Sequence, residues 1–239
     1  MALDRASPNF GPRIKADQEQ GLSLLVIHYT GMQTCAEALE HLCDPGAMVS
    51  AHLVIDLDGT VHRLVAEGHR AWHAGKSYWR GISDVNSASI GIELVNPGHK
   101  FGYEPFPDPQ IARLIEISEQ IVASHHIPPA GVVGHSDVAP GRKADPGELF
   151  PWNRLAKAGL GLWPVPENSE ISENPWADLA LIGYAVPGDP SRGGAILEPE
   201  TAEKDVIIAF QRHYLPEAIS GVLDLQTQKR IHSVAEELS

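Results

Sequence analysis

Residues 134–147 bring together side chains that could bind a metal ion: His135, Lys143 and Asp145. A short apolar run leads into His135, and two Pro-Gly pairs further along exclude a helix through the residues that follow. The chain must therefore curl, and a rigid curled loop can hold Asp145 beside His135 at little entropic cost. This stretch predicts two ligands of a metal site.

A third candidate ligand is His28, in the apolar run of residues 24–29, whose length and branching are typical of a buried strand. Zinc in hydrolases commonly has three protein ligands and one open position for water. Two histidines and one carboxylate fit that set, so the residues predict a catalytic zinc site.

Each of these residues also has an ordinary interpretation. A lone histidine at a strand end is more often a satisfied core or surface residue. Asp145, which precedes Pro146, could simply begin a turn. A serine hydrolase is disfavoured, because the nucleophile motif around Ser136 would need glycine where Val138 stands.

Glu93 is a single carboxylate within the apolar strand predicted over residues 89–95. A buried glutamate is rare unless it is paired or takes part in chemistry. Because burial raises the pKa of a carboxyl group toward neutrality, Glu93 is a candidate general base.

The elements that must position these residues form an α/β domain. Thr34 and Glu37 have capping-box spacing and predict a helix over residues 35–43. Asp58-Gly59 predicts a hairpin between strands 52–56 and 60–64. Asp108 is expected to cap a long helix with Pro109 in its first turn.

The chain is expected to form two domains. Residues 1–160 would form the catalytic domain, in which residues 1–21 are an irregular arm on the surface. Residues 161–175, rich in Gly, Pro, Asn and Ser, would be a linker, and residues 176–239 would form a small domain of three helices.

Trp72 and His73 begin a loop rich in aromatic residues and glycine that could form the wall of a substrate cleft. Anchoring of the loop by its tryptophans is the alternative. His52 is placed with them, as a cleft residue or as a neighbour of the zinc ligands, and ordinary packing is the alternative for all three.

The composition limits the class of protein. A formal net charge of −13 over 239 residues disfavours general binding to nucleic acid or anionic lipid. Cys35 and Cys43 would point to different faces of one helix and are expected to be unpaired. No membrane span or signal segment is evident, so the cytoplasm is expected, with the periplasm as the alternative; the oligomeric state is left open.

Several short motifs, in order over roughly residues 20–160, strongly resemble the type 2 family of zinc-dependent N-acetylmuramoyl-L-alanine amidases. They are residues 27–30 (Ile-His-Tyr-Thr), 50–52 (Ser-Ala-His), 58–60 (Asp-Gly-Thr), 71–75 (Ala-Trp-His-Ala-Gly), 90–93 (Ile-Gly-Ile-Glu), 134–137 (Gly-His-Ser-Asp) and 143–147 (Lys-Ala-Asp-Pro-Gly).

The resemblance implies a mixed central β-sheet flanked by helices, with zinc bound at His28, His135 and Asp145. It further implies that Glu93 is the general base and that Lys143 stabilises the oxyanion. The substrate would be peptidoglycan or its muropeptide fragments, cut between N-acetylmuramic acid and L-alanine. Residues 176–239 resemble, more loosely, the small helical peptidoglycan-binding domain often joined to such enzymes.

Two other functions remain as competing hypotheses. A recognition protein of the same fold would bind muropeptide without cutting it, but would normally have lost a ligand position, and all are filled here. A metalloprotease of ordinary peptides is disfavoured because the chain has no His-Glu-x-x-His motif.

Overall fold

A five-stranded mixed sheet forms the centre of the computed structural model, which describes residues 4–13, 21–164 and 170–238. Its strand order is β4-β3-β6-β2-β7. β3, β6, β2 and β7 run parallel, and β4 is an antiparallel edge strand. The strands are β2 (Leu24–Tyr29), β3 (Leu53–Ile55), β4 (Val61–Arg63), β6 (Ser89–Leu94) and β7 (Val132–Gly134). The predicted mixed α/β fold is confirmed.

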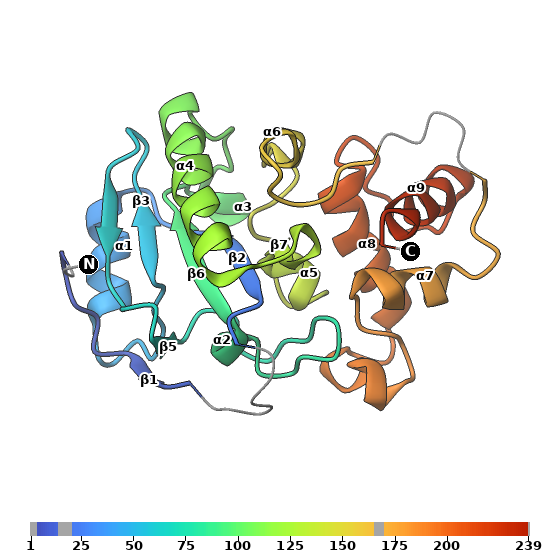
Figure 1. Cartoon of the computed structure of the whole chain (residues 1–239), viewed down its shortest axis with the longest axis horizontal. Coiled ribbons are helices and arrows are strands. Elements are labelled where there is room, and N and C mark those ends of the chain that lie inside the picture. The colour runs from blue at the N-terminus through green and yellow to red at the C-terminus, as the bar shows by residue number, and fades with distance from the viewer. Residues whose placement is uncertain (1–3, 14–20, 165–169, 239) are drawn as a thin grey trace.

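Alternation along the strands decides what each face of the sheet contacts. Leu25 and Ile27 of β2 pack with their β6 neighbours against the long helix α4 (Asp108–His125), which crosses the front of the sheet in Figure 1. On the other face, Val54 of β3 lies under α1 (Cys35–Cys43), and Val26 packs toward the C-terminal helices. His28 continues the Val26 face, so its side chain lies on the face opposite α4.

The other elements surround this sheet. Short helices follow the strands: α2 (Val85–Ala88), α3 (Gly98–Phe101), η1 (Pro129–Gly131), α5 (His135–Val138) and α6 (Trp152–Lys157). The C-terminal region contains α7 (Pro175–Ile182), η2 (Pro190–Arg192), η3 (Gly194–Ile196), α8 (Ala202–Tyr214) and α9 (Leu225–Glu236). In the described part of the chain, no helix combines the length and the apolar character that crossing a bilayer requires.

Most predicted elements are found with bounds close to those expected. α1 begins with the predicted capping box between Thr34 and Glu37, and the Asp58-Gly59 hairpin joins β3 to β4. Cys35 and Cys43 are unpaired, as predicted.

Two local predictions were wrong. Asp108 is the first residue of α4, whose N-cap is Pro107, and the helix has no side-chain cap; Pro109 at its second position has no N–H that would need one. Part of the N-terminal arm is a strand, since β1 (Phe10–Pro12) pairs antiparallel with β5 (His69–Ala71). The rest of the arm at residues 1–3 and 14–20, positions 165–169 of the predicted linker, and residue 239 lie outside the described residues.

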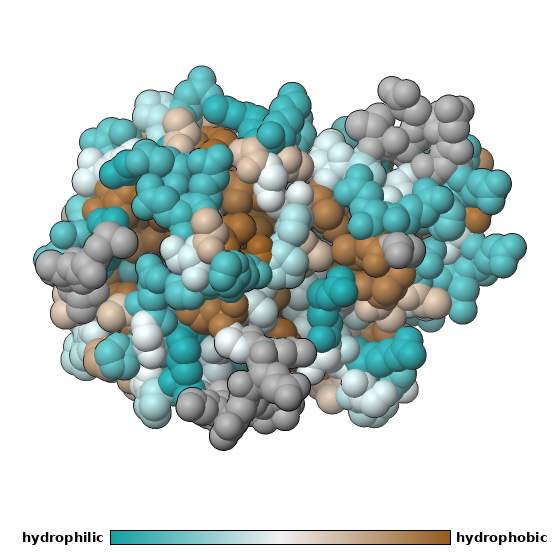
Figure 2. Space-filling view, viewed as in Figure 1, coloured by the Kyte–Doolittle hydropathy of each residue, from teal (hydrophilic) through white to brown (hydrophobic). Residues whose placement is uncertain are grey.

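The C-terminal helices share a hydrophobic core with the sheet. Val206 and Phe210 of α8 belong to the same cluster of buried side chains as Val26 and Val133 of the sheet. Figure 2 shows side chains filling the boundary between the two regions, with apolar residues on both sides. The three predicted helices are therefore present, and the division of the chain at residues 161–175 stays a prediction.

Candidate active site

Strand register brings the candidate site residues into one row across the sheet. Ile27 of β2 pairs with Gly134 at the end of β7, so the next residues along the two chains, His28 and His135, are neighbours. On its other side His28 pairs with Glu93 of β6. Paired residues of parallel strands point to the same face, so the three side chains meet on the face opposite α4.

Three ligand atoms converge at the centre of this row. The Nδ1 atoms of His28 and His135 lie 2.9 Å apart, and Asp145 Oδ2 lies 3.0 Å from the first and 2.9 Å from the second. All three side chains are buried. They form one of two groups within the described residues that could hold a metal ion, and the loop that carries Asp145 folds back as predicted.

The hydrogen bond of His135 away from the cluster fixes its tautomer. His135 Nε2 lies 3.1 Å from the carbonyl oxygen of Ala74, which can only accept, and 3.4 Å from Arg142 Nη2, which can only donate; the shorter contact assigns the proton to Nε2. The Nδ1 lone pair of His135 therefore faces His28 and Asp145. The guanidinium of Arg142 also donates to the Ala74 carbonyl and holds this loop in place.

A second chain of hydrogen bonds fixes the tautomer of His28. Ser89 Oγ donates to the Val85 carbonyl (2.6 Å) and so accepts from His73 Nε2 (3.1 Å). His73 Nδ1 is then free to accept from His28 Nε2 at 3.0 Å. Carbonyl groups thus orient both histidines as neutral ligands, the arrangement expected around a protein-bound metal ion.

Gly91 leaves the space that His73 occupies. A Cβ on Gly91 would lie 2.5 Å from His73 Cγ, closer than real contacts allow. The glycine of the Ile-Gly-Ile-Glu motif therefore lets His73 lie against β6, between Ser89 and His28. The sequence showed this glycine but gave no signal of its role, because that role depends on a loop packing against the strand.

The charge states of the cluster suit a cation. Burial, reinforced by the neighbouring His135, lowers the pKa of His28 to about 4, so the ring is neutral at pH 7. Burial alone would raise the pKa of Asp145, but contacts with His135 and His28 outweigh it and hold that pKa far below its usual range. Neutral imidazoles and an ionised carboxylate are the forms that ligate metal.

The carboxylate of Glu93 is poorly stabilised by the side chains around it. Its Oε2 is buried and has no hydrogen-bond partner within the described residues. Burial, together with repulsion from Asp145, raises the pKa of Glu93 well above its usual value, against the opposing charge of Lys143. A carboxyl group in this state can exchange a proton near neutral pH.

Lys143 lies at the exposed edge of the same site. Its side chain is exposed, and its charge acts on both Glu93 and His28. A hydrogen bond of 3.1 Å from its backbone N–H to the Ala139 carbonyl oxygen fixes the start of the turn that leads to Asp145.

The three predicted cleft residues lie in different surroundings. His73 contacts His28, one of the candidate metal ligands, through its Nδ1 atom. His52 is fully buried, its Nδ1 accepts from the Gly91 N–H, and its Nε2 lies 3.1 Å from the His69 carbonyl and 3.0 Å from Arg13 Nη2, so its place in a cleft stays a prediction. Trp72 is partly exposed, and its backbone is hydrogen bonded to Ser50.

The C-terminal region supports the loop that carries His135 and Asp145. It does so through Asp137, two residues after His135. The buried Asp137 carboxylate accepts from the Gly134 N–H (2.7 Å), the Tyr184 hydroxyl (2.6 Å) and His213 Nδ1 (2.7 Å). His213 also stacks on Trp152 at 3.8 Å between ring centroids. The sequence gave no indication of this contact, because it joins residues 61 positions apart.

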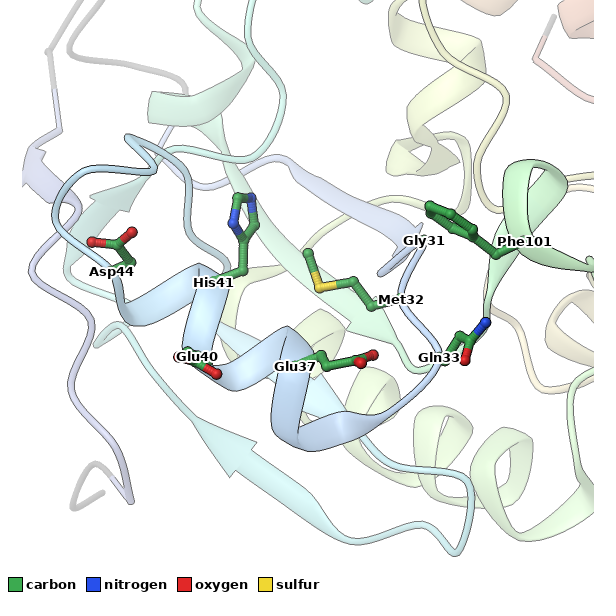
Figure 3. A pocket seen from close by; sticks show the side chains of 8 residues that line it. All are labelled: Gly31, Met32, Gln33, Glu37, Glu40, His41, Asp44 and Phe101. Atoms are coloured by element: carbon green, nitrogen blue, oxygen red, sulfur yellow. The ribbon is translucent and has the colours of Figure 1, made fainter.

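A hollow of about 610 Å³ lies beside the loop that follows β2, between α1 and Phe101 of α3. Figure 3 shows Glu37, Glu40 and His41 of α1 along one side, with Met32 and Phe101 across from them. His28, His135 and Asp145 do not line it. The hollow therefore follows the strand that carries His28 but is separate from the metal cluster.

Comparison with known proteins agrees with this geometry. Residues 18–148, which include all the candidate metal ligands, match the Amidase_2 family, described as N-acetylmuramoyl-L-alanine amidase. The chain belongs to this family. As an amidase it is 36% identical to the N-acetylmuramoyl-L-alanine amidase AmiD of Escherichia coli (strain K12), over 94% of this chain and 83% of AmiD.

Solved structures of relatives cover nearly the whole amidase. The complex of E. coli AmiD with the substrate anhydro-N-acetylmuramic acid-L-Ala-D-gamma-Glu-L-Lys has a TM-score of 0.75 at 34% identity, over 98% of this chain and 93% of that one. AmpDH3 from Pseudomonas aeruginosa has a TM-score of 0.79 at 29% identity, over 99% and 98%. The 1,6-anhydro-N-acetylmuramyl-L-alanine amidase AmpD of Haemophilus influenzae is 34% identical over 62% of this chain and 86% of its own.

Proposed function

We propose that this amidase uses zinc to hydrolyse the amide between the lactyl group of N-acetylmuramic acid and L-alanine, in peptidoglycan or its muropeptide fragments. The observation that carries the proposal is the convergence of ligand atoms from His28, His135 and Asp145 beside Glu93. AmiD, which this chain resembles over 98% of its length, has been solved with such a substrate bound.

The donor set fits zinc on chemical grounds. Two neutral imidazoles and one carboxylate are a common zinc ligand set in hydrolases, and their other ring nitrogens are held by hydrogen bonds as such sites require. When bound, zinc supplies a Lewis acid for the scissile carbonyl and acidifies a water molecule.

Glu93 is proposed to move the proton. It accepts a proton from the attacking water and returns it to the leaving amine, which must be protonated to depart. The raised pKa of Glu93 suits both steps, because it makes the carboxylate a stronger base toward the water and lets the carboxyl group keep the proton until the more basic leaving amine takes it.

Lys143 is proposed to stabilise the negative charge that develops on the carbonyl oxygen. Its exposed ammonium group acts on Glu93 and His28 and so lies near the reacting atoms. A positioned donor of this kind contributes about a hundredfold or more to the rate. Lys143→Ala should therefore lower kcat by about that factor, and Lys143→Arg should recover part of it.

The experiment is a digest of defined muropeptides with purified protein, followed by mass spectrometry and elemental analysis. Bound zinc together with release of free peptide from the lactyl group supports the proposal. Zinc-dependent binding of muropeptide without release would indicate a recognition protein instead, and cleavage of casein but not of muropeptide would indicate a protease. Running anhydro-muropeptide beside intact peptidoglycan tells which substrate is preferred.

The C-terminal region, residues 176–239, is proposed to contact the glycan or peptide of the wall. A groove of about 720 Å³ between Trp176, Leu197 and Leu223 supports this. The opposite side of α8 is buried against the sheet, so the groove lies on the side of α8 that a ligand could reach. Trp176→Ala should then weaken sedimentation with insoluble peptidoglycan while leaving cleavage of small muropeptides unchanged. Equal sedimentation of both proteins would leave this region a purely structural part.

The cellular compartment is proposed to be the cytoplasm, with the periplasm as the alternative. The unpaired thiols Cys35 and Cys43 support a reducing compartment. Fractionation of cells with an antibody to the protein distinguishes the two.

A further inference from the structure

A second group of metal-ligand side chains lies at the far edge of the sheet from the active site. Cys35 begins α1, Asp56 follows β3, and His62 lies in the edge strand β4. The Cys35 Sγ atom, an Asp56 carboxylate oxygen and a His62 ring nitrogen all lie within 4.8 Å of one another. None of the three takes part in the proposed hydrolysis.

The hairpin register explains why these residues meet. Val54 of β3 pairs with His62, and the Asp56 N–H donates to the Thr60 carbonyl at 2.8 Å. Asp56 is two residues after Val54, so its side chain points to the same face as those of Val54 and His62. α1 packs on that face over Val54, which brings Cys35 above the pair.

We propose that Cys35, Asp56 and His62 bind a second divalent cation of the zinc class, outside the active site. A thiolate, an imidazole and a carboxylate are all accepted zinc ligands, and the thiolate favours zinc over magnesium or calcium. Zinc bonds of about 2.0–2.3 Å would place the ligand atoms roughly 3.5 Å apart, which side-chain torsions alone can reach from the present spacing. The site is half-buried, so water can complete the coordination.

The thiol already has a carboxylate partner that could share the ion. Burial, followed by the charge of Asp56 and a hydrogen bond to it, raises the pKa of Cys35 to about 11, so the thiol keeps its proton when no metal is bound. On binding, the S–H bond breaks, the proton leaves to solvent and the cation takes its place between sulfur and carboxylate.

The two sites are separate. His28, Glu93, Val54 and His62 form one transverse row over four adjacent strands. Three strand spacings of about 4.8 Å each put His62 roughly 14 Å from His28, with the apolar Val54 between. A cation at Cys35 would tie the start of α1 to the edge hairpin and leave the hydrolytic residues untouched.

Co²⁺ bound at Cys35, Asp56 and His62 can be detected separately from Co²⁺ bound at the candidate active site. The metal-free full-length protein is loaded with Co²⁺, and the near-ultraviolet thiolate-to-cobalt charge-transfer band is recorded with the bound metal content. The active site has no cysteine among its candidate ligands, so only coordination by a thiol gives this band. Cys43, at the other end of α1, provides a matched control, because its Sγ donates to the Arg5 carbonyl at 3.9 Å instead.

The expected result is about two equivalents of cobalt and a thiolate band in the wild type and in Cys43→Ser. Cys35→Ser should lose the band and about one equivalent while keeping amidase activity, and His62→Gln should weaken the band. Asp145→Asn should keep the band while losing hydrolysis, which makes the test independent of the proposed function. A wild type without the band, or a band that survives Cys35→Ser, overturns the proposal; circular dichroism checks that each variant is folded.

Discussion

At the scale of single residues, Glu93 places a carboxylate where it lowers the stability of the folded protein. Its Oε2 is buried without a partner in the described chain, and Asp145 repels its charge. Leaving a buried polar group unsatisfied costs roughly 1–3 kcal/mol, so the folded protein is destabilised there. Such local cost is typical of catalytic positions.

Glu93→Gln is therefore expected to have opposite effects on activity and on stability. The amide cannot accept the proton, so kcat should fall by about 10²–10⁴-fold while zinc content is unchanged. In metal-free protein, at a pH above the raised pKa of Glu93, the neutral amide avoids the buried charge, so the Tm should rise by about 2–4 °C, the shift that ~1 kcal/mol gives in a chain of this size. Steady-state kinetics and calorimetry measure the two.

The pH dependence of the gain in Tm follows from the direction in which the pKa of Glu93 is shifted. Burial and Asp145 raise the pKa of Glu93 in the folded state above the value of about 4.3 that the unfolded chain has. The folded protein thus binds the proton more tightly, and Glu93 destabilises it increasingly as pH rises through this interval. The Tm advantage of Glu93→Gln should be largest above the raised pKa and vanish below about pH 4. An advantage that grows on acidification would contradict the assignment.

At the scale of elements, one face of β6 holds the active site together. Ser89, Gly91 and Glu93 alternate onto that face, where they orient His73, make room for it and supply the carboxylate. The intervening Ile90 and Ile92 pack against α4 on the other face. Six residues of a single strand thus serve both the core and the chemistry.

Gly91→Ala tests whether His73 must lie where it does. The new Cβ would lie within 2.5–2.7 Å of three atoms of the His73 ring, so the ring must move and release His28 Nε2. Loss of the hydrogen-bond partner of a metal-binding histidine commonly costs 10–100-fold in metal affinity. A fall of about that size in zinc affinity is expected, measured by competition with a chromogenic chelator. Gly68→Ala is the matched control, because a Cβ there meets no atom within 4 Å. Unchanged affinity in Gly91→Ala would mean that the His73 contact is not needed.

The sequence predicted which side chains meet at this site better than it predicted what surrounds them. His28, Asp145 and Glu93 could be found because zinc ligands and a buried carboxylate are residue types with few other uses in those patterns. The support from Ser89 and Gly91 could not be predicted, since it depends on where a loop 16 residues earlier in the chain packs. Asp108 was misplaced for a related reason: helix bounds depend on local geometry that several polar residues fit equally well.

At the scale of the whole molecule, the C-terminal helices share one hydrophobic core with the sheet that carries the candidate site. Leu24, Val26 and Val133 of the sheet are buried in one cluster with Tyr184 and Phe210. The predicted division at residues 161–175 rests on composition and stays a prediction. Composition marks a linker, but only the apolar faces on both sides decide whether the parts stay apart.

Asp137→Ala should reveal how tightly the two regions are joined. The change leaves the Tyr184 hydroxyl, the Gly134 N–H and His213 Nδ1 without their buried partner. Unsatisfied groups of this kind cost about 1–3 kcal/mol each, so urea denaturation should show one of the larger losses of unfolding free energy for a single substitution. Glu119→Ala on α4 is the control, since Glu119 is exposed and its side chain makes no hydrogen bond or ion pair within the described residues; it should change stability by less than about 0.5 kcal/mol.

Removal of residues 165–239 should disable the amidase even though every proposed catalytic residue remains. The truncation exposes the apolar face that Leu24, Val26 and Val133 present to the C-terminal helices. It also removes Tyr184 and His213, the hydrogen-bond partners of Asp137 beside the candidate ligand His135. An exposed patch of this kind favours aggregation, so the shortened chain should bind a hydrophobic dye, elute in aggregates and bind zinc weakly. A monomeric truncated chain that unfolds cooperatively and cleaves muropeptide at the full rate would show that the C-terminal region is dispensable for the site.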